Sequence, residues 1–158
     1  MSLKGLTQLE IRKAKTNIFA PKGDFPPINY DRFVEAIEKH MPFFIWNEDT
    51  EGGKAEKKAD LETGKPARMN FYKHRAVCYK VKDKTYYRFS VSYLEGWNKI
   101  FIINTAPAMM TIEFLEILFD IAEICEAKLY YSDTKFITEE RIEKEKELAL
   151  EKKAKKAN

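Results

Sequence analysis

The sequence predicts an α+β fold: an antiparallel meander sheet of 4–5 strands packed against one long apolar helix, with N-terminal helices and a projecting charged C-terminal helix. Three observations lead to this fold class. Apolar and polar residues alternate along residues 77–93, the pattern of half-buried strands. Residues 112–125 are rich in large apolar side chains, with acids at helical spacing among them. Residues 138–158 are densely charged and contain few large apolar side chains.

Length and composition point to a packed domain. The chain has 158 residues, of which 44% are hydrophobic, 13% aromatic and 34% charged. We expect a single domain over residues 1–158, and the net charge of +3 is too small for the whole chain to act as a polyanion binder. The start of the chain has no leader-like apolar stretch, and four acids interrupt its most apolar window, Ala106 to Cys125. We therefore expect a cytoplasmic protein without a membrane span.

The first part of the chain predicts two helices. Residues 1–28 form an N-terminal arm in this interpretation, with a short amphipathic helix, because Thr7 and Glu10 have capping-box spacing. A second helix is predicted from about Tyr30 to His40. Its apolar face has the spacing i, i+3, i+4 and consists of Phe33, Ala36 and Ile37.

A short strand and a long loop are expected next. Pro42 ends the second helix, and residues 43–46 read as a buried strand. Residues 47–68 contain Leu61 as their only large aliphatic side chain, and their six acids and five bases nearly cancel. Glycines and a proline punctuate this segment, which we interpret as a long polar, solvated loop.

Residues 69–104 are predicted to form three antiparallel strands. A three-residue loop at 82–84 would place the apolar residues of the first two strands on one shared face, and a slip of one residue would separate them. The third strand, Trp97 to Asn104, has apolar residues at both its odd and its even positions, which belong to its two faces. We therefore expect it to be covered on both sides. The pairs in this register are Val81 with Thr85, Tyr79 with Tyr87, and Val77 with Phe89.

Helices dominate the last third of the chain. The main apolar helix is predicted to open at Thr105-Ala106-Pro107, and its apolar surface is too wide to be covered by the sheet alone. A strand is predicted over residues 128–131. Thr138 is the predicted N-cap of a charged helical tail over residues 138–158.

Few residues suggest catalysis. His40 continues the apolar face of its helix, where a capping or structural role is expected. His74 lies opposite Ser92 in the predicted register, but no acid and no oxyanion motif accompany the pair. Two isolated cysteines, Cys78 and Cys125, and two isolated histidines match no zinc pattern. We therefore predict no catalytic, cofactor-binding or metal-binding residues, no cofactor, and a protein that is not an enzyme.

The charge distribution is the strongest functional signal. Residues 69–104 hold seven bases and two acids, a net charge of +5, whereas residues 105–127 hold five acids and no base. A basic sheet and an acidic helix form complementary docking surfaces. The predicted interaction surface consists of Lys80, Lys82, Lys84, Tyr86, Arg88, Trp97 and Lys99 on the sheet, and of Glu113, Glu116, Asp120 and Glu123 on the helix.

These features predict a non-catalytic module for protein–protein interaction or assembly. One form of it is self-association of the basic sheet with the acidic helix of another copy. The alternative is a single-stranded nucleic-acid-binding protein, because bases interleave with aromatic residues along the strands. An enzyme whose site is assembled only in three dimensions is a third hypothesis. Neither a small-molecule ligand nor a membrane partner is indicated.

Overall fold

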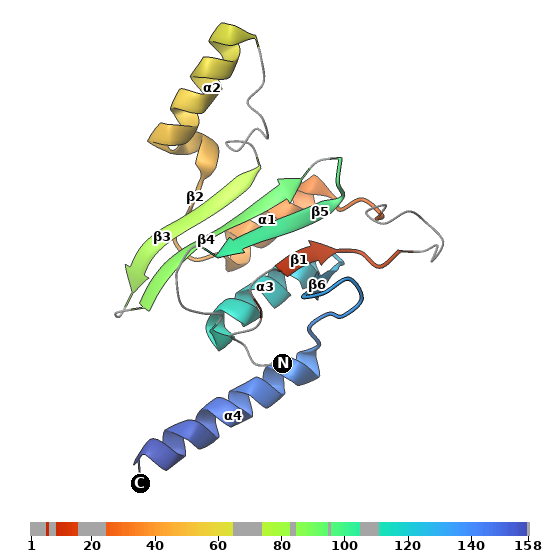
Figure 1. The fold of residues 1–158 in the computed structure, drawn as a ribbon, viewed down its shortest axis with the longest axis vertical. Helices are drawn as coiled ribbons and strands as arrows, with labels where there is room; N and C mark the ends of the chain where they lie inside the picture. The colour runs from red at the N-terminus through yellow and green to blue at the C-terminus, as the bar shows by residue number, and fades with distance from the viewer. Residues whose placement is uncertain are drawn as a thin grey trace.

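The structure of the chain is a computed structural model. It describes residue 6 and residues 9–15, 25–64, 74–82, 85–94, 96–104 and 111–157, with only the backbone at 78–82, 85–88, 104 and 157. Within these ranges, four α-helices accompany one antiparallel sheet (Figure 1). The helices are α1 (Tyr30–His40), α2 (Glu51–Thr63), α3 (Ile112–Ile124) and α4 (Glu139–Ala157), and a short 3-10 turn, η2 (Asn47–Asp49), precedes α2.

The sheet has six strands in the order β2-β3-β4-β5-β1-β6, and every neighbouring pair is antiparallel. The predicted α+β class is confirmed, but the predicted number of four to five strands is too low. The strands are β1 (Leu9–Arg12), β2 (Phe44–Trp46), β3 (Arg75–Lys82), β4 (Thr85–Leu94), β5 (Lys99–Asn104) and β6 (Lys128–Tyr130).

The additional strand is β1, and it corrects the predicted N-terminal helix. β1 lies inside the sheet between β5 and β6, with Leu9 opposite Ile102 and Ile11 opposite Ile100. Leu9 and Ile11 are 2% and 0% exposed and alternate with the polar Glu10. Alternation with a period of two suits a strand between two neighbours, and here it prevails over the capping-box spacing.

One face of the sheet packs on α1 and α3 and forms the core (Figure 1). The apolar face predicted for α1 is confirmed, because Phe33, Ala36 and Ile37 are fully buried in this core. Asn29 caps the helix by accepting a hydrogen bond from the backbone N–H of Arg32 at 3.1 Å. The sheet contributes to the core chiefly through Leu9, Ile11, Ala76, Phe89, Val91, Ile100, Ile102 and Leu129.

The observed register between β3 and β4 differs by one residue from the predicted one. Val81 lies opposite Tyr86 and Val77 opposite Ser90, so the two strands are joined by residues 83–84 rather than by three residues. Val77 is 0% exposed although it lies on the face away from the helices. Apolar burial on both faces of β3 removes the one-sided pattern on which the predicted register depended.

The segment predicted as a long polar loop contains a helix. Within its described part, residues 47–64, the turn η2 leads into α2, and Thr50 Oγ1 accepts a hydrogen bond from Gly53 N–H at 3.0 Å. Gly64 ends α2 in the left-handed conformation with φ 66°. Gly53 is the only buried residue of α2, and the helix stands away from the sheet (Figure 1). Local capping therefore defines this helix more than packing does.

The apolar helix α3 begins at Ile112, with Thr111 as its N-cap, rather than at the predicted 105–107, which lie outside the described residues. α1 and α4 both pack against α3, which agrees with the prediction that the sheet alone could not cover it. α4 begins after Thr138, whose Oγ1 accepts a hydrogen bond from Arg141 N–H, as predicted. Residues 147–156 of α4 are all exposed, and the C-terminal part of the helix projects from the body (Figure 1).

Four non-glycine residues of the described chain have left-handed backbone conformations. Phe43, His74, Asn98 and Glu126 have φ values of 52°, 50°, 56° and 54°. Each stands shortly before a strand, namely β2, β3, β5 and β6. These residues turn the chain into the sheet at positions where glycine is the commoner choice.

Candidate interaction surface on the outer face of the sheet

The outer face of the sheet is the face turned away from α1 and α3. It faces the viewer in Figure 1. Strand pairing aligns its residues in rows, one of which runs from Arg75 through Ser92, Phe101 and Glu10 to Tyr130. Positively charged, aromatic and apolar side chains thus stand side by side on this surface.

Glu10 holds two cations on the outer face. Its carboxylate lies 3.2 Å from Lys99 Nζ of β5 and 3.3 Å from Arg12 Nε of β1. Arg12 Nη2 also donates hydrogen bonds to the backbone carbonyls of Ser132 and Asp133, both at 3.0 Å. The side chains of Arg12 and Lys99 are only 6% and 14% exposed. Both cations therefore have polar partners within the chain.

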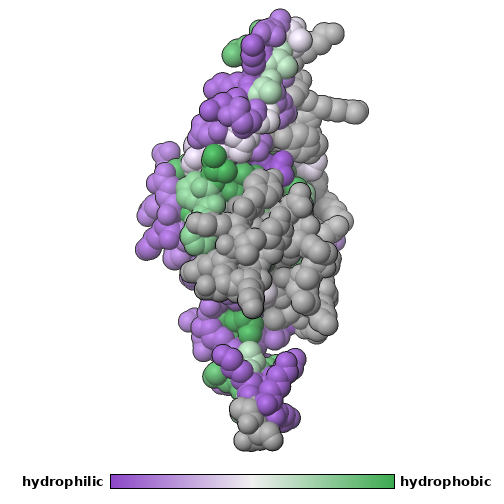
Figure 2. Space-filling model, turned by 90° about the vertical axis from the view of Figure 1, so that its left-hand side faces the viewer, coloured by the Kyte–Doolittle hydropathy of each residue, from purple (hydrophilic) through white to green (hydrophobic). Residues whose placement is uncertain are grey.

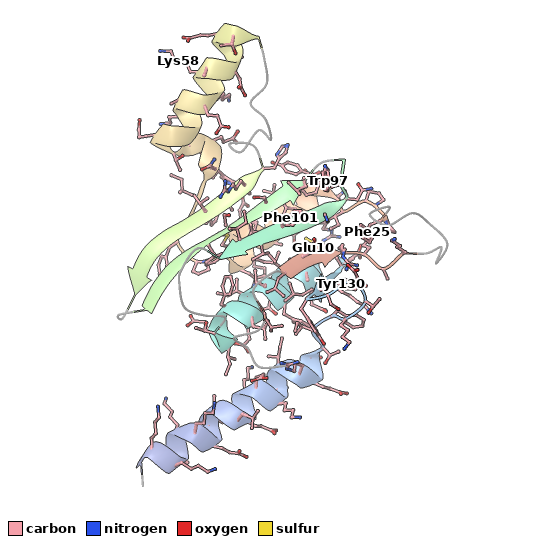
Figure 3. The ribbon with its side chains drawn as sticks, in the orientation of Figure 1. Glu10, Phe25, Lys58, Trp97, Phe101 and Tyr130 are labelled. Atoms are coloured by element: carbon pink, nitrogen blue, oxygen red, sulfur yellow. The ribbon has the colours of Figure 1, made fainter. Side chains whose placement is uncertain are left out.

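Aromatic rings flank the same cations. Arg12 Cζ lies 3.7 Å from the ring centroid of Tyr130, and Lys99 Nζ lies 4.6 Å from that of Phe101. Phe25 and Trp97 are second rings for these cations, at 4.7 Å and 5.4 Å (Figure 3). Such contacts stabilise a partly buried cation by about 0.5–2 kcal/mol each. The prediction missed this cluster because it placed Glu10 on a helix, although the alternation of residues 9–12 is visible in the sequence.

Apolar side chains are exposed at several separate points of the outer face. Trp97 is 60% exposed in the turn before β5, and Ile103 of β5 is 41% exposed. Ile45, at the far side of the sheet, is 43% exposed and belongs to the same row as Ile103. Between them Val77 and Ser90 are buried, and Arg75 Nη2 donates a hydrogen bond to Ser90 Oγ at 3.1 Å.

The predicted basic residues do not share one face. Lys80 lies opposite Tyr87 and has the parity of Ala76 in the core, whereas Tyr86 lies opposite Val81 and has the parity of Ser90 on the outer face. Alternate residues of a strand belong to the same face of the sheet, so the position of Lys82 shares a face with that of Lys80, and the position of Arg88 shares a face with that of Tyr86. The side chains of these four residues, and all of Lys84, lie outside the described part of the structure. Of the predicted sheet residues, Lys99 and Trp97 come together.

The predicted acidic stripe of α3 is partly engaged within the chain. Lys146 of α4 forms an ion pair with Glu116, and this hydrogen bond raises the pKa of Lys146 above its ordinary value. Asp120 Oδ2 lies 3.8 Å from His40 Nδ1 of α1, which gives His40 a structural contact. Glu113 and Glu123 are exposed. Docking of this stripe on another copy would therefore compete with contacts to α1 and α4.

The predicted pairing of His74 with Ser92 is wrong. Ser92 lies opposite Arg75 on the outer face, because of the register difference described above. The His74 ring packs instead against Tyr30 and Tyr93, with centroids 4.5 Å and 6.0 Å apart. Burial raises the pKa of Tyr30 above its usual 10.0, and the nearby acids add to that rise, led by Glu48.

A hollow and a buried thiol are further candidate sites. A shallow hollow of about 480 Å³ at the C-terminal end of α3 has a rim of opposite charges, including Lys13 and Glu123. Burial raises the pKa of the Cys125 thiol to about 12. Among the residues with described positions, no group of three or more His, Cys, Asp or Glu could hold a metal ion. The helices in those ranges lack a continuous apolar stretch of the length that a membrane span requires.

Comparison of the chain with protein-family models, curated proteins and solved structures finds no match. No relative therefore supplies a function. A function can be inferred from the outer face, which has exposed apolar side chains and two cations that are paired with Glu10.

Proposed function

We propose that the chain is a non-catalytic binding module that docks a protein partner on the outer face of its sheet. The observation that carries this proposal is the exposure of Trp97 and Ile103 on a face that no described helix covers. Exposed aromatic and aliphatic side chains on one face, with polar groups between them, are typical of protein-binding surfaces.

The charges on this face favour a protein over a polyanion. Glu10 forms ion pairs with both Arg12 and Lys99, and the side chains of these two cations are largely buried. A phosphate chain binds to accessible cations, which displace the counterions condensed on the phosphates, whereas the Arg12 and Lys99 side chains are only 6% and 14% exposed. A protein partner can instead cover Trp97 and meet Glu10 and Lys99 as a polar rim.

An affinity experiment tests this proposal. The wild-type protein and a Trp97→Ala/Ile103→Glu variant serve as baits in extracts of cells that produce the protein. The control is Leu61→Glu, since Leu61 is 78% exposed on α2, away from the outer face. We expect the wild type and the control to retain a protein that the double variant loses. Identical captures by all three baits, with the fold of each checked by circular dichroism, would refute the proposal.

Single-stranded nucleic acid is the second candidate ligand. The succession of cations over rings, which includes Lys128 Nζ at 3.9 Å from the Phe136 centroid, favours it. Bases stack on exposed aromatic rings, and each stacked base contributes about 1–3 kcal/mol. Anisotropy of a fluorescein-labelled oligothymidine at low salt distinguishes the two candidates. Salt-sensitive binding that Trp97→Ala abolishes would favour nucleic acid, and no binding would leave the protein partner as the ligand.

A further inference from the structure

The two halves of α4 differ in charge. Residues 139–147 contain five acids and three bases, whereas residues 148–157 contain four lysines and a single acid, Glu151. The lysines are Lys152, Lys153, Lys155 and Lys156. We call residues 148–157 the lysine end of α4. The whole chain has a net charge of only +3, so the lysine end is a local concentration of positive charge.

The bases of the two halves also differ in their partners. In the first half, Arg141 Nε lies 3.1 Å from Glu145 Oε1, and Lys146 pairs with Glu116 of α3. Within the described part of the chain, no ion pair engages the four lysines of the lysine end, and all four are exposed. The cations of the lysine end are therefore available to a ligand.

The helix dipole accounts for only part of this charge. Cations stabilise the C-terminal end of a helix, but the effect is confined to about the last turn. That turn of α4 contains Lys155 and Lys156. Lys152 and Lys153 lie about one turn earlier, so the dipole does not explain their presence.

The four lysines cover almost half of the helix circumference. At 3.6 residues per turn, they span an arc of about 160°. Residues 147–156 are all exposed, and this part of α4 projects from the body (Figure 1). A ligand can therefore surround the lysine end and meet cations on two sides of the helix.

The lysine end lacks the apolar face of a membrane-binding helix. Leu148 and Leu150 are 42% and 67% exposed, but they lie about 200° apart around the helix axis, on opposite sides. In Figure 2, the hydrophobic areas at the lower end of the molecule are accordingly small and separate, with hydrophilic side chains between them. Helices that lie in a membrane interface gather their large apolar side chains on one side. Accessible charge without an apolar face favours a nucleic acid as the ligand.

We propose that the lysine end of α4 binds the phosphates of double-stranded DNA without reading the base sequence. The major groove of B-DNA, which is about 12 Å wide, admits an α-helix. Lysines on two sides of such a helix can reach the phosphates on both walls of the groove. Lysine is a flexible point charge and binds the phosphates of any sequence alike.

This inference does not depend on the proposed docking function. α4 packs against α3, whereas the outer face of the sheet is turned away from α3. A protein partner on the outer face and DNA at the lysine end would therefore occupy separate surfaces of the molecule.

Fluorescence anisotropy of a short labelled DNA duplex tests the proposal. Four lysines that each displace a counterion predict a slope of about −3.6 for the logarithm of the binding constant against the logarithm of the salt concentration. Binding should thus weaken about 150-fold between about 20 and about 80 mM salt. In the triple variant Lys152→Gln/Lys153→Gln/Lys156→Gln, one lysine remains, and the slope should fall to about −0.9.

The matched control is Lys54→Gln/Lys57→Gln/Lys58→Gln, which removes the same charge from α2, another exposed and projecting helix. It should bind the duplex as the wild type does. Glutamine and lysine have similar helix propensities, so circular dichroism should show unchanged helix content in both variants. No binding by the wild type at the lowest salt, or an equal loss of binding in the two variants, would overturn the proposal.

Vesicles of phosphatidylserine and phosphatidylcholine distinguish DNA from a membrane as the source of phosphate. At equal phosphate concentration, we expect the protein to bind the duplex more tightly than the vesicles, because the lysine end has no apolar face to insert. Sedimentation of the protein with the vesicles measures this binding. Tighter binding to the vesicles than to the duplex would overturn the assignment to DNA.

Discussion

The Nζ atom of Lys99 lies 3.2 Å from Oε1 of Glu10, and this ion pair joins β5 to β1 on the outer face. The same carboxylate contacts Arg12, whose side chain is 6% exposed. Removal of the Glu10 charge would leave two poorly hydrated cations next to each other. Loss of a carboxylate shared in this way therefore destabilises the fold more than loss of one partner of a surface ion pair does.

We predict that Glu10→Gln lowers the free energy of unfolding by about 1–3 kcal/mol, because Arg12 and Lys99 lose their shared carboxylate. Urea denaturation followed by circular dichroism measures the change. Lys58→Gln is the control, since its ion pair with Glu62 lies on the exposed surface of α2 (Figure 3). That variant should stay within about 0.5 kcal/mol of the wild type. Equal effects of the two substitutions would contradict the role of Glu10.

Two adjacent glycines of α2 should respond in opposite directions to alanine. A Cβ at Gly53 would lie 1.7 Å from the Asn47 carbonyl oxygen, whereas a Cβ at Gly52 meets nothing within 4 Å. Gly52→Ala should therefore stabilise α2 by about 0.5–1 kcal/mol. Gly53→Ala should instead disrupt the junction between η2 and α2. Amide hydrogen exchange in residues 51–63 measures both effects, and slower exchange in Gly53→Ala would contradict the packing of this junction.

Cys125 should be almost unreactive in the folded protein. It is 2% exposed, and its burial raises the thiol pKa from the usual 9.0 to about 12, so the reactive thiolate is scarce at pH 8. In a Cys78→Ser background, we expect iodoacetamide to label the chain only after denaturant is added. Mass spectrometry of the intact protein measures the labelling. Rapid labelling without denaturant would show that Cys125 is accessible.

The same pKa shift makes a prediction for alkaline pH. The raised pKa means that the folded state keeps the proton more tightly than the unfolded state does. The resulting contribution to stability is complete below pH 9 and is lost as the pH rises toward 12. Denaturation midpoints of Cys125→Ala should therefore fall less steeply over this range than those of the wild type. If the midpoints of both proteins fell equally steeply with pH, the raised pKa of Cys125 would be contradicted.

Ile142 should anchor α4 to the body of the protein. It is 4% exposed, whereas Leu150 in the same helix is 67% exposed. Ile142→Ala removes most of a buried side chain, a change that costs about 2–4 kcal/mol in a core and here should release α4. Limited proteolysis should then cut within residues 139–157 much faster than in the wild type. Leu150→Ala is the matched control, and equal cleavage of both variants would refute the anchor.

The sequence predicts helices and strands well where one periodicity prevails. The apolar spacing of α1 and the N-cap of α4 at Thr138 are confirmed. Prediction failed at β1, where a four-residue strand is too short for its alternation to outweigh a capping-box spacing. It failed at α2 because a helix held by its caps, with one buried residue, has no apolar face to detect.

The candidate surface was predicted less well, and the register of β3 and β4 explains why. The predicted register assumed that apolar residues lie on a single face, but Val77 and Ser90 are both buried on the outer face. With a slip of one residue, Lys80 and Lys82 occupy positions of the core face, whereas Arg88 occupies a position of the outer face. The Glu10 cluster needs three strands that are distant in the sequence, so only the fold could bring it together.

The left-handed residues before four of the strands allow the backbone and the side chain to be tested separately. At Phe43, His74, Asn98 and Glu126, glycine would keep the turn with less steric cost, whereas alanine would keep the cost and lose the side chain. The difference between the two variants at one position gives the backbone contribution. What both variants lose in common gives the side-chain contribution. At each of these four strand starts, the backbone and side-chain contributions to the free energy of unfolding can therefore be measured separately.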